Sequence, residues 1–260
     1  MNSYWLCAGA LACCLTGLWA LSVRLKNSSI VDIFWGAGFV VVAWVTFAFS
    51  EGLLQRRLLL TGLTTLWGLR LSVYLAIRNR GHGEDPRYTA MRNRQGPSWW
   101  WKSLFIVFAL QGVLLFIVSL PVQVAQHAER SPLGMFDVIG AVLAITGVLF
   151  ESAGDWQLAR FKSMPQNKGQ IMARGLWRYT RHPNYFGDFL VWWGLFVIAC
   201  ATGTAWWTIA GPVVMSILLM RVSGVTLLEK TMSKRPGYAQ YAARTSAFFP
   251  RPPKRERTLL

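Results

Sequence analysis

Charged residues are scarce in this chain, and acidic residues are the scarcest of them. Only 15% of the 260 residues are charged, and 11 Asp and Glu stand against 27 Lys and Arg, which gives a formal net charge of +16. Soluble domains average about 25% charged residues, so this composition, with 53% hydrophobic residues, argues against an ordinary soluble protein. In a soluble protein such basicity would indicate a nucleic-acid partner. In a membrane protein it follows from cationic cytoplasmic loops, and we expect no nucleic acid here.

Several motifs of soluble enzymes are also missing. The sequence contains no Rossmann glycine fingerprint, no Walker motif, no zinc-type His pair and no Gly-x-Ser-x-Gly elbow. Its four Cys lie in apolar segments without metal or disulfide spacing, where thiols behave as small hydrophobes. These absences exclude a conventional soluble dinucleotide fold, and we expect no metal site.

Long apolar runs take the place of those motifs. A helix needs about 20 mostly apolar residues to cross a bilayer, and seven runs approach that length: residues 4–23, 30–49, 58–77, 103–122, 136–158, 185–200 and 205–222. The sequence therefore predicts an all-α, multi-pass membrane bundle of about seven transmembrane helices, forming one membrane domain over residues 1–260. Pro212 predicts a kink in the last run, and residues 251–260 are predicted to be a disordered tail.

The basic residues predict the orientation of the bundle. Of the 27 Lys and Arg, nearly all fall in alternate connections and in the C-terminal tail. Only Arg56, Arg57 and Arg130 lie in the other connections, and Arg70 lies inside a run. Cationic loops stay in the cytoplasm, which predicts an N-terminus outside and a C-terminus in the cytoplasm, in the inner membrane if the cell is bacterial.

Ionisable side chains inside apolar runs are costly, so each needs a partner or a cavity. The runs and their ends carry Asp32, Arg70, Glu151, Asp155, Asp188, Arg221 and Glu229. Glu151 and Asp155 are four residues apart and share a helix face, as do Arg70 and Tyr74. For each residue alone, an internal ion pair or an interfacial anchor is an equal alternative. As a set, they predict one polar cavity that opens to the cytoplasm.

Residues 175–188 are dense in hydrogen-bonding groups and run directly into an apolar segment. Donors for phosphate come from Arg160, Lys162, Arg174, Arg178 and Arg181. Asn184 can pair with an amide such as nicotinamide, and His182 is expected to support the loop or contact a cofactor. The collection fits a dinucleotide phosphate. It would also fit S-adenosylmethionine, a phospholipid headgroup or a polyprenyl phosphate.

These residues also carry a family resemblance. The order Gly175-Leu176-Trp177, Arg181-His182-Pro183-Asn184-Tyr185 and Gly187-Asp188 resembles the signature of the steroid 5-alpha-reductase C-terminal domain. It is similar also to sterol C14 and C7 reductases and to isoprenylcysteine carboxyl methyltransferases. Residues 31–36, 67–71 and 228–238 resemble in particular the bacterial branch labelled DUF1295.

The resemblance implies a seven-helix membrane fold with NADPH entering from the cytoplasm. Residues 151–250 would form the cofactor-binding half and residues 1–150 the substrate side. Together the residues and the resemblance give this candidate cofactor-binding set: Arg70, Asp155, Arg160, Lys162, Trp177, Arg181, His182, Asn184, Tyr185, Asp188, Glu229 and Tyr241. Trp67 stands where the steroid reductases have a Tyr, so the resemblance does not identify a steroid as the substrate.

Three functional hypotheses follow. The first is an NADPH-dependent reductase of a polarised carbon–carbon double bond in a lipophilic substrate that arrives from the membrane lipids, with Asp32 or Tyr74 as the catalytic acid. A carboxylic acid can play this part where burial keeps it protonated. The second is an S-adenosylmethionine-dependent methyltransferase, although that group typically shows a late Glu-Glu pair, and here Glu229 is followed by Lys230. The third is a non-catalytic lipid-binding protein. The oligomeric state is not indicated.

Overall fold

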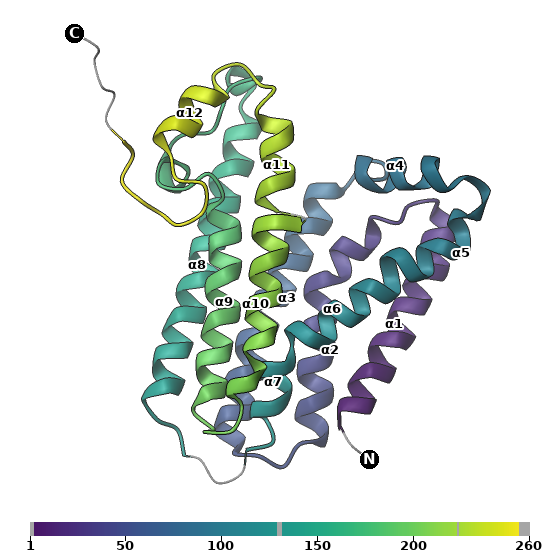
Figure 1. Ribbon diagram of the computed structural model, residues 1–260, viewed down its shortest axis with the longest axis vertical. Coiled ribbons are helices and arrows are strands. Elements are labelled where there is room, and N and C mark those ends of the chain that lie inside the picture. The colour runs from purple at the N-terminus through teal and green to yellow at the C-terminus, as the bar shows by residue number, and fades with distance from the viewer. Residues whose placement is uncertain (1–2, 129–131, 223, 255–260) are drawn as a thin grey trace. The chain divides into compact units, whose positions relative to one another are not determined.

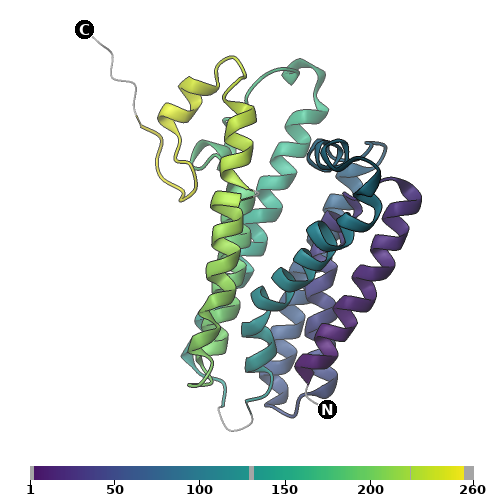
Figure 2. The same ribbon diagram turned by 45° about the vertical axis from the view of Figure 1, so that its right-hand side comes forward.

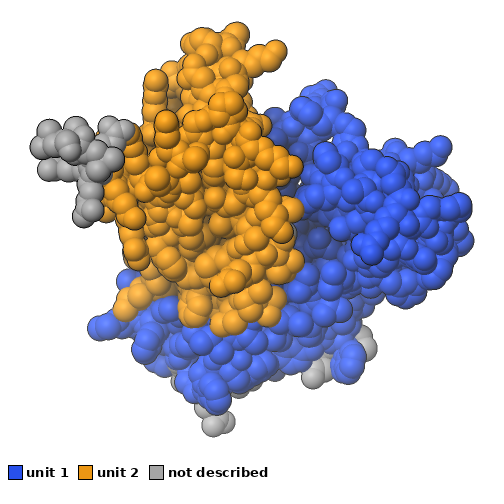
Figure 3. Space-filling model, turned by 45° about the horizontal axis from the view of Figure 1, so that its top comes forward, with its two compact units in different colours: residues 1–138, 195–211 blue, residues 139–194, 212–260 orange. Residues whose placement is uncertain are grey.

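The computed structural model describes residues 3–128, 132–222 and 224–254. Within these ranges the regular elements are helices, and the only β-type pairing is a single bridge between Thr180 and Ser246. The chain divides into two compact units, residues 1–138 with 195–211, and residues 139–194 with 212–260 (Figure 3). The predicted halves, 1–150 and 151–250, follow this division only roughly, because residues 195–211 belong to the first unit.

Six helical segments of the described chain are long and apolar enough to cross a membrane. They are α1 (Ser3–Leu25), α2 (Ile30–Phe49), α3 (Leu54–Asn79), α8 (Met135–Ser163) and the helical runs Pro86–Val118 and Trp206–Met232. The protein is therefore an all-α, multi-pass membrane bundle, as predicted. The predicted run 185–200 corresponds to α9 (Pro183–Cys200), which is not among the six; Asn184 and Asp188 make its first turns polar. Large apolar side chains such as Leu149 (65%) and Phe105 (62%) are exposed, as lipid contact requires.

In the first unit, α1, α2 and α3 lie side by side (Figures 1 and 2). Gly36 on α2 and Gly68 on α3 face each other at the α2–α3 contact. A Cβ added at Gly68 would lie 2.5 Å from the carbonyl oxygen of Gly36, and one at Gly36 would meet the carbonyl oxygen of Gly68. Only glycine allows two helix backbones to approach this closely.

The predicted run 103–122 is built from several short pieces. α4 (Pro86–Gln95) leads through η1 (Gly96–Ser98), α5 (Trp99–Ser103) and the π-helix η2 (Leu104–Ala109) to α6 (Leu110–Val118) and α7 (Leu120–Ala125). Figure 1 shows α4 from the side and Figure 2 shows it nearly end-on, so it lies roughly perpendicular to the long helices of its unit. Asp85 caps α4, because its side chain accepts a hydrogen bond from the Arg87 N–H at 2.9 Å.

A buried ion pair joins the start of α3 to the start of α8. The guanidinium of Arg56 makes two 2.8 Å hydrogen bonds to the carboxylate of Asp137, and both side chains are almost completely buried. Arg56 also donates to the carbonyl of Pro132, and Asp137 also accepts from the N–H of Gly134. From sequence, Arg56 was expected only as a loop cation. Arg130, counted with it, lies outside the described residues.

In the second unit, α8 and α9 lie side by side along a seam of glycines (Figure 1). A Cβ at Gly147 would lie 2.5 Å from the carbonyl oxygen of Gly187, and one at Gly187 would lie 2.5 Å from the backbone nitrogen of Glu151. One heptad further along α9, a Cβ at Gly194 would lie 2.6 Å from the backbone nitrogen of Ala144. This close contact fixes the helix faces that carry the acidic residues of this unit.

The last helical run is irregular in more than one place. It begins as the 3-10 helix η5 (Trp206–Ile209), and Pro212 lies in the first turn of α10 (Ala210–Ile217) that follows, so the predicted kink there stays a prediction. The run departs from α-geometry later, at the π-helix η6 (Leu218–Val222). It then continues as α11 (Val225–Met232) and α12 (Tyr238–Arg244).

Candidate functional site

Glu229 on α11 is the hub of a hydrogen-bonded cluster in the second unit. Its Oε1 atom accepts from Arg181 Nε at 2.8 Å, from His182 Nε2 at 3.0 Å and from the Tyr238 hydroxyl at 2.7 Å. Arg181 and His182 directly precede Pro183, the first residue of α9, and Tyr238 is the first residue of α12. One carboxylate thus joins three segments that are far apart in sequence.

Most of the donors of Arg181 are used within the protein. Its Nη1 donates to the carbonyls of Ala242 at 2.8 Å and Thr245 at 3.2 Å, and its backbone N–H donates to Ser246 at 2.9 Å. A guanidinium has five N–H donors, so few remain for a ligand. Arg181 therefore holds its loop to α11 and α12, and a contact with phosphate stays a prediction for its remaining Nη2 donors.

The environment of His182 favours the neutral form of its imidazole. Burial lowers the pKa of its imidazole; Glu229 opposes this shift, whereas the charge of Arg181 adds to it. In a neutral imidazole that faces a carboxylate, Nε2 carries the proton, which leaves Nδ1 as an acceptor. The ring stacks on Tyr185 with centroids 5.6 Å apart. Burial, followed by the nearby Glu229 carboxylate, raises the pKa of Tyr238, so this phenol remains a hydrogen-bond donor.

Trp177 and Tyr241, both predicted cofactor residues, are connected directly. The Tyr241 hydroxyl donates to the Trp177 carbonyl at 2.6 Å, and the Trp177 indole donates to the Gly154 carbonyl on α8 at 3.0 Å. Trp177 lies in the short helix η4 (Gly175–Arg178), which begins at a glycine with φ +59°. That loop is therefore fixed to α8 at one end and to α12 at the other.

The C-terminal segment closes over this loop. The Thr180 hydroxyl donates to the Phe248 carbonyl at 2.7 Å, and the Arg251 N–H donates to the Tyr179 carbonyl at 3.0 Å. The Lys254 N–H donates to the Arg244 carbonyl at 3.0 Å. The predicted disordered tail thus has a defined position as far as Lys254, and residues 255–260 lie outside the described chain.

The predicted residues on α8 and α9 fall into two groups. Asp155, Glu151 and Asp188 are buried, with 2%, 3% and 7% exposed. Arg160 and Lys162 are exposed near the end of α8, and the Arg160 guanidinium lies 5.4 Å from the Trp156 ring. Asn184 and Tyr185, in the first turn of α9, are half-buried. The structure thus gathers the loop and C-terminal residues into one cluster and leaves Arg160 and Lys162 on the surface beside it.

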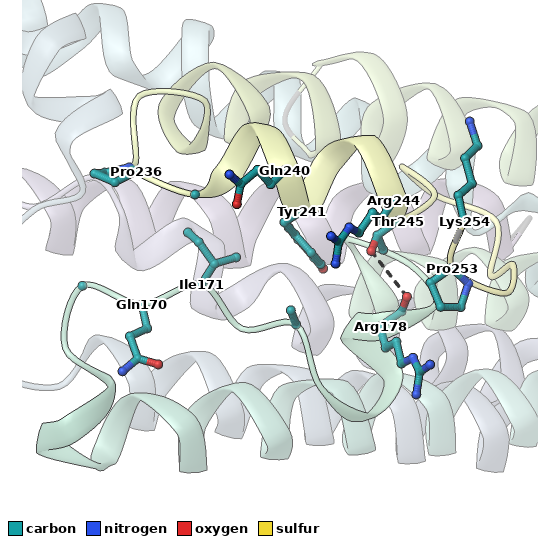
Figure 4. A pocket seen from close by; sticks show the side chains of 13 residues that line it. Gln170, Ile171, Arg178, Pro236, Gln240, Tyr241, Arg244, Thr245, Pro253 and Lys254 are labelled. Carbon is teal, nitrogen blue, oxygen red and sulfur yellow. Dashed lines mark hydrogen bonds between the residues drawn. The ribbon is translucent and has the colours of Figure 1, made fainter. Parts of the chain in front are cut away.

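A cationic pocket of about 770 Å³ adjoins the cluster (Figure 4). It is lined by Gly169, Gln170, Ile171, Ala173, Arg178, Pro236, Gly237, Gln240, Tyr241, Arg244, Thr245, Pro253 and Lys254. Three of these residues are basic and none is acidic. Of the predicted cofactor-binding set, only Tyr241 lines the pocket, together with Arg178, which was predicted as a phosphate donor. The basic lining residues Arg244 and Lys254 were not predicted, although the density of basic residues in the tail was a signal for them.

In the first unit, Asp32 serves as an anchor for α4. Its carboxylate accepts from the Tyr88 hydroxyl at 2.6 Å and from Arg87 Nη2 at 2.7 Å, and Arg87 also binds Asp85 at 2.9 Å. A guanidinium partner favours the ionised carboxylate. Asp32 is thus held by two partners on α4, and its catalytic role stays a prediction.

Tyr74, the other catalytic candidate, lies between two cations on α3. The guanidinium groups of Arg70 and Arg78 are 5.4 Å and 5.7 Å from its ring centroid, as residues four apart on a helix allow. The side chain is half-buried. Tyr74 and Arg70 belong to the first unit and form this local group there.

Glu84, which the sequence did not single out, forms a further salt bridge in the first unit. Glu84 accepts from Arg92 at 2.7 Å and from the backbone N–H of Ser28 at 2.6 Å. Burial acts to raise the pKa of Glu84, but these hydrogen bonds hold it below its usual range. Glu84 thus ties the loop before α4 to the α1–α2 connection.

Comparison with known proteins gives a family. The family model described as "Protein of unknown function (DUF1295)" matches residues 18–245. A relative from Schizosaccharomyces pombe, described as "Uncharacterized protein C594.04c", is 28% identical over 266 residues, which cover 90% of this chain and 76% of the relative. No solved structure matches the chain.

Proposed function

This chain belongs to the DUF1295 family, and on that premise we propose that it is an NADPH-dependent reductase of a carbon–carbon double bond in a lipophilic substrate. The observation that carries the proposal lies in the second unit. There, the cluster around Glu229 brings together residues predicted from separate segments, and a cationic pocket adjoins it.

The sign of the pocket's charge favours a dinucleotide over S-adenosylmethionine. Arg178, Arg244 and Lys254 line it without an acidic residue. Opposite charges attract and like charges repel. NADPH carries several phosphate charges, whereas S-adenosylmethionine carries a sulfonium cation. The pocket therefore supports the reductase hypothesis and opposes the methyltransferase hypothesis.

The chemistry of the available donors fits NADPH. The basic residues of the pocket would hold phosphate oxygens, and the half-buried Asn184 offers both a donor and an acceptor for a carboxamide. NADPH supplies a hydride when it is bound. The neutral His182 and the carboxylate of Glu229 would keep the loop before α9 in place.

Tyr74 is our candidate for the proton donor. Its hydroxyl oxygen would hold the proton that the reduced product takes up, and the guanidinium groups of Arg70 and Arg78 would stabilise negative charge that develops on a substrate oxygen nearby. The lipid-exposed helices give a lipophilic substrate a route from the bilayer.

The test is a thermal-unfolding titration of the detergent-purified protein with NADPH, NADH and S-adenosylmethionine. A ligand that binds only the folded state stabilises it by about 2.7 kcal/mol at 100 times its dissociation constant. We expect NADPH to raise the unfolding temperature and S-adenosylmethionine to leave it unchanged. Stabilisation by S-adenosylmethionine alone would favour the methyltransferase, and no response to any of the three would favour a lipid-binding protein.

A further inference from the structure

The C-terminal segment supplies one wall of the cationic pocket. Residues 251–254 are held at two points, by the hydrogen bonds from Arg251 to Tyr179 and from Lys254 to Arg244, each 3.0 Å long. Pro253 and Lys254 therefore line the pocket opposite residues of the loop that follows α8. Figure 4 shows Arg244 beside Tyr241, with the long side chains of Arg178 and Lys254 extending from the rim.

Two basic residues of the pocket, Arg178 and Lys254, differ from the arginines that bind carboxylates. Arg56, Arg87, Arg92 and Arg181 are each paired with an acid. In the described part of the chain, neither Arg178 nor Lys254 makes an ion pair. Together with Arg244, they concentrate positive charge from three separate segments around one cavity. An anion in the pocket would be attracted by this charge.

We propose that this pocket binds a phosphate monoester and that Lys254 of the C-terminal segment completes the site. A monoester carries about −1.5 to −2 charges near neutral pH, more than the single charge on each phosphate of a diester-type linkage. It therefore gains most from a pocket with several basic residues and no acidic one.

This inference rests on the proposed function, under which the monoester is the 2′-phosphate of NADPH. Sites that prefer NADH use an acidic residue to accept the ribose hydroxyls, whereas an Arg accommodates the 2′-phosphate. The pocket has no acidic residue among its lining side chains. Arg178 and Lys254 are thus the residues that select NADPH over NADH.

The experiment measures the affinity of the full-length, detergent-purified protein for adenosine 2′,5′-bisphosphate and adenosine 5′-monophosphate by calorimetry, and for NADPH and NADH in parallel. The variants are Arg178→Gln and Lys254→Gln. Lys234→Gln is the matched control, because Lys234 is an exposed cation of the same unit that does not line the pocket. Loss of one charge-assisted hydrogen bond should weaken binding of the bisphosphate about tenfold. Binding of the 5′-monophosphate should change little, and Lys234→Gln should match the parent.

The outcomes separate this inference from the proposed function. Suppose that the parent binds NADPH, and that Arg178→Gln and Lys254→Gln still prefer NADPH over NADH as strongly as the parent does. The assignment of the monoester site is then overturned, and the reductase proposal stands. If the parent binds neither NADPH nor the bisphosphate, the reductase proposal fails. The same affinity measurements are made with inorganic phosphate and with vesicles containing phosphatidic acid. If only these bind, and both variants weaken them, the monoester site stands with a lipid headgroup or free phosphate as its ligand.

Discussion

The two units of the molecule use charge in opposite ways. In the first unit three carboxylates are each paired with an arginine: Asp137 with Arg56, Asp32 with Arg87 and Glu84 with Arg92. In the second unit one acid, Glu229, serves several donors, and basic residues around the pocket outnumber acidic ones. Paired charge holds segments of the first unit together, whereas the surplus of positive charge around the pocket is the basis of the ligand site that we propose.

The largest effect should come from breaking a matched pair. Removing one partner of a buried ion pair leaves an uncompensated charge and costs about 3–5 kcal/mol. We expect Asp137→Ala to destabilise the protein by about that amount, measured as a lower midpoint of thermal unfolding in detergent. Glu84→Ala should cost less, because its partner Arg92 is partly exposed to solvent.

A double substitution checks the reason for this loss. Replacing a buried ion pair with apolar side chains of similar volume is often neutral or stabilising. Arg56→Met combined with Asp137→Leu should therefore recover most of the stability lost in Asp137→Ala. If the double variant unfolds at or below the temperature of the single variant, the pair does more than neutralise its own charges.

The glycine contacts test a feature that the two units share. A methyl group at Gly36 or Gly187 would collide with the backbone of the facing helix, and overpacking of this kind costs about 1–3 kcal/mol. We expect Gly36→Ala and Gly187→Ala both to lower the unfolding midpoint. Gly62→Ala is the control, since a Cβ at this position of α3 meets nothing within 4 Å. It should stabilise the protein by about 0.4–1 kcal/mol.

Neutralising the hub of the second unit should have a smaller effect on stability than on binding. Glu229→Gln keeps an acceptor oxygen but loses the charge, and we expect a loss of about 1–2 kcal/mol from weakened charge-assisted hydrogen bonds. Because Glu229 positions Arg181 and His182, the rise in the protein's unfolding temperature on addition of NADPH should become smaller as well. Unchanged stabilisation by NADPH would show that the hub does not support the ligand site.

The smallest effect should be a pH dependence. Burial lowers the pKa of His182 in the folded state, with Glu229 and Arg181 as its charged neighbours. As the pH falls, this imidazole is therefore protonated in the unfolded chain before it is protonated in the folded protein. Stability should therefore fall as the pH decreases below about 6.5, by at most about 1.4 kcal/mol per pH unit. His182→Gln should flatten this part of the profile. Burial also lowers the pKa of His127 in the first unit, and His127→Gln is the comparison.

Local patterns in the sequence predicted most of the helices but not how they pack. Apolar runs placed α1, α2 and α9 within a few residues of their observed bounds, because length and hydropathy alone decide a span. The glycine seams were missed, since a glycine at a helix contact is distinguished only by the partner that faces it. The spacing of Gly187 and Gly194 by one heptad was the available signal.

The sequence likewise predicted residues of the candidate site but not all of their partners. The motif residues Trp177, His182 and Glu229 do meet Tyr241, Arg181 and Tyr238 in one cluster. Sequence could not assign Arg181 and Asp32 to internal partners, because pairing depends on which long-range neighbours the fold supplies. It also could not show that Lys254 returns to Arg244, a contact made by backbone groups that every residue carries.

The C-terminal segment is the last part of the pocket to be synthesised. The loop at residues 179–181 is hydrogen-bonded by Ser246, Phe248 and Arg251, which leave the ribosome long after the loop and α9. The helices can insert while this loop still lacks its final partners. The pocket is then assembled only in a chain that has been translated as far as Lys254, so a chain terminated before this segment would keep its membrane helices and lack one wall of the pocket.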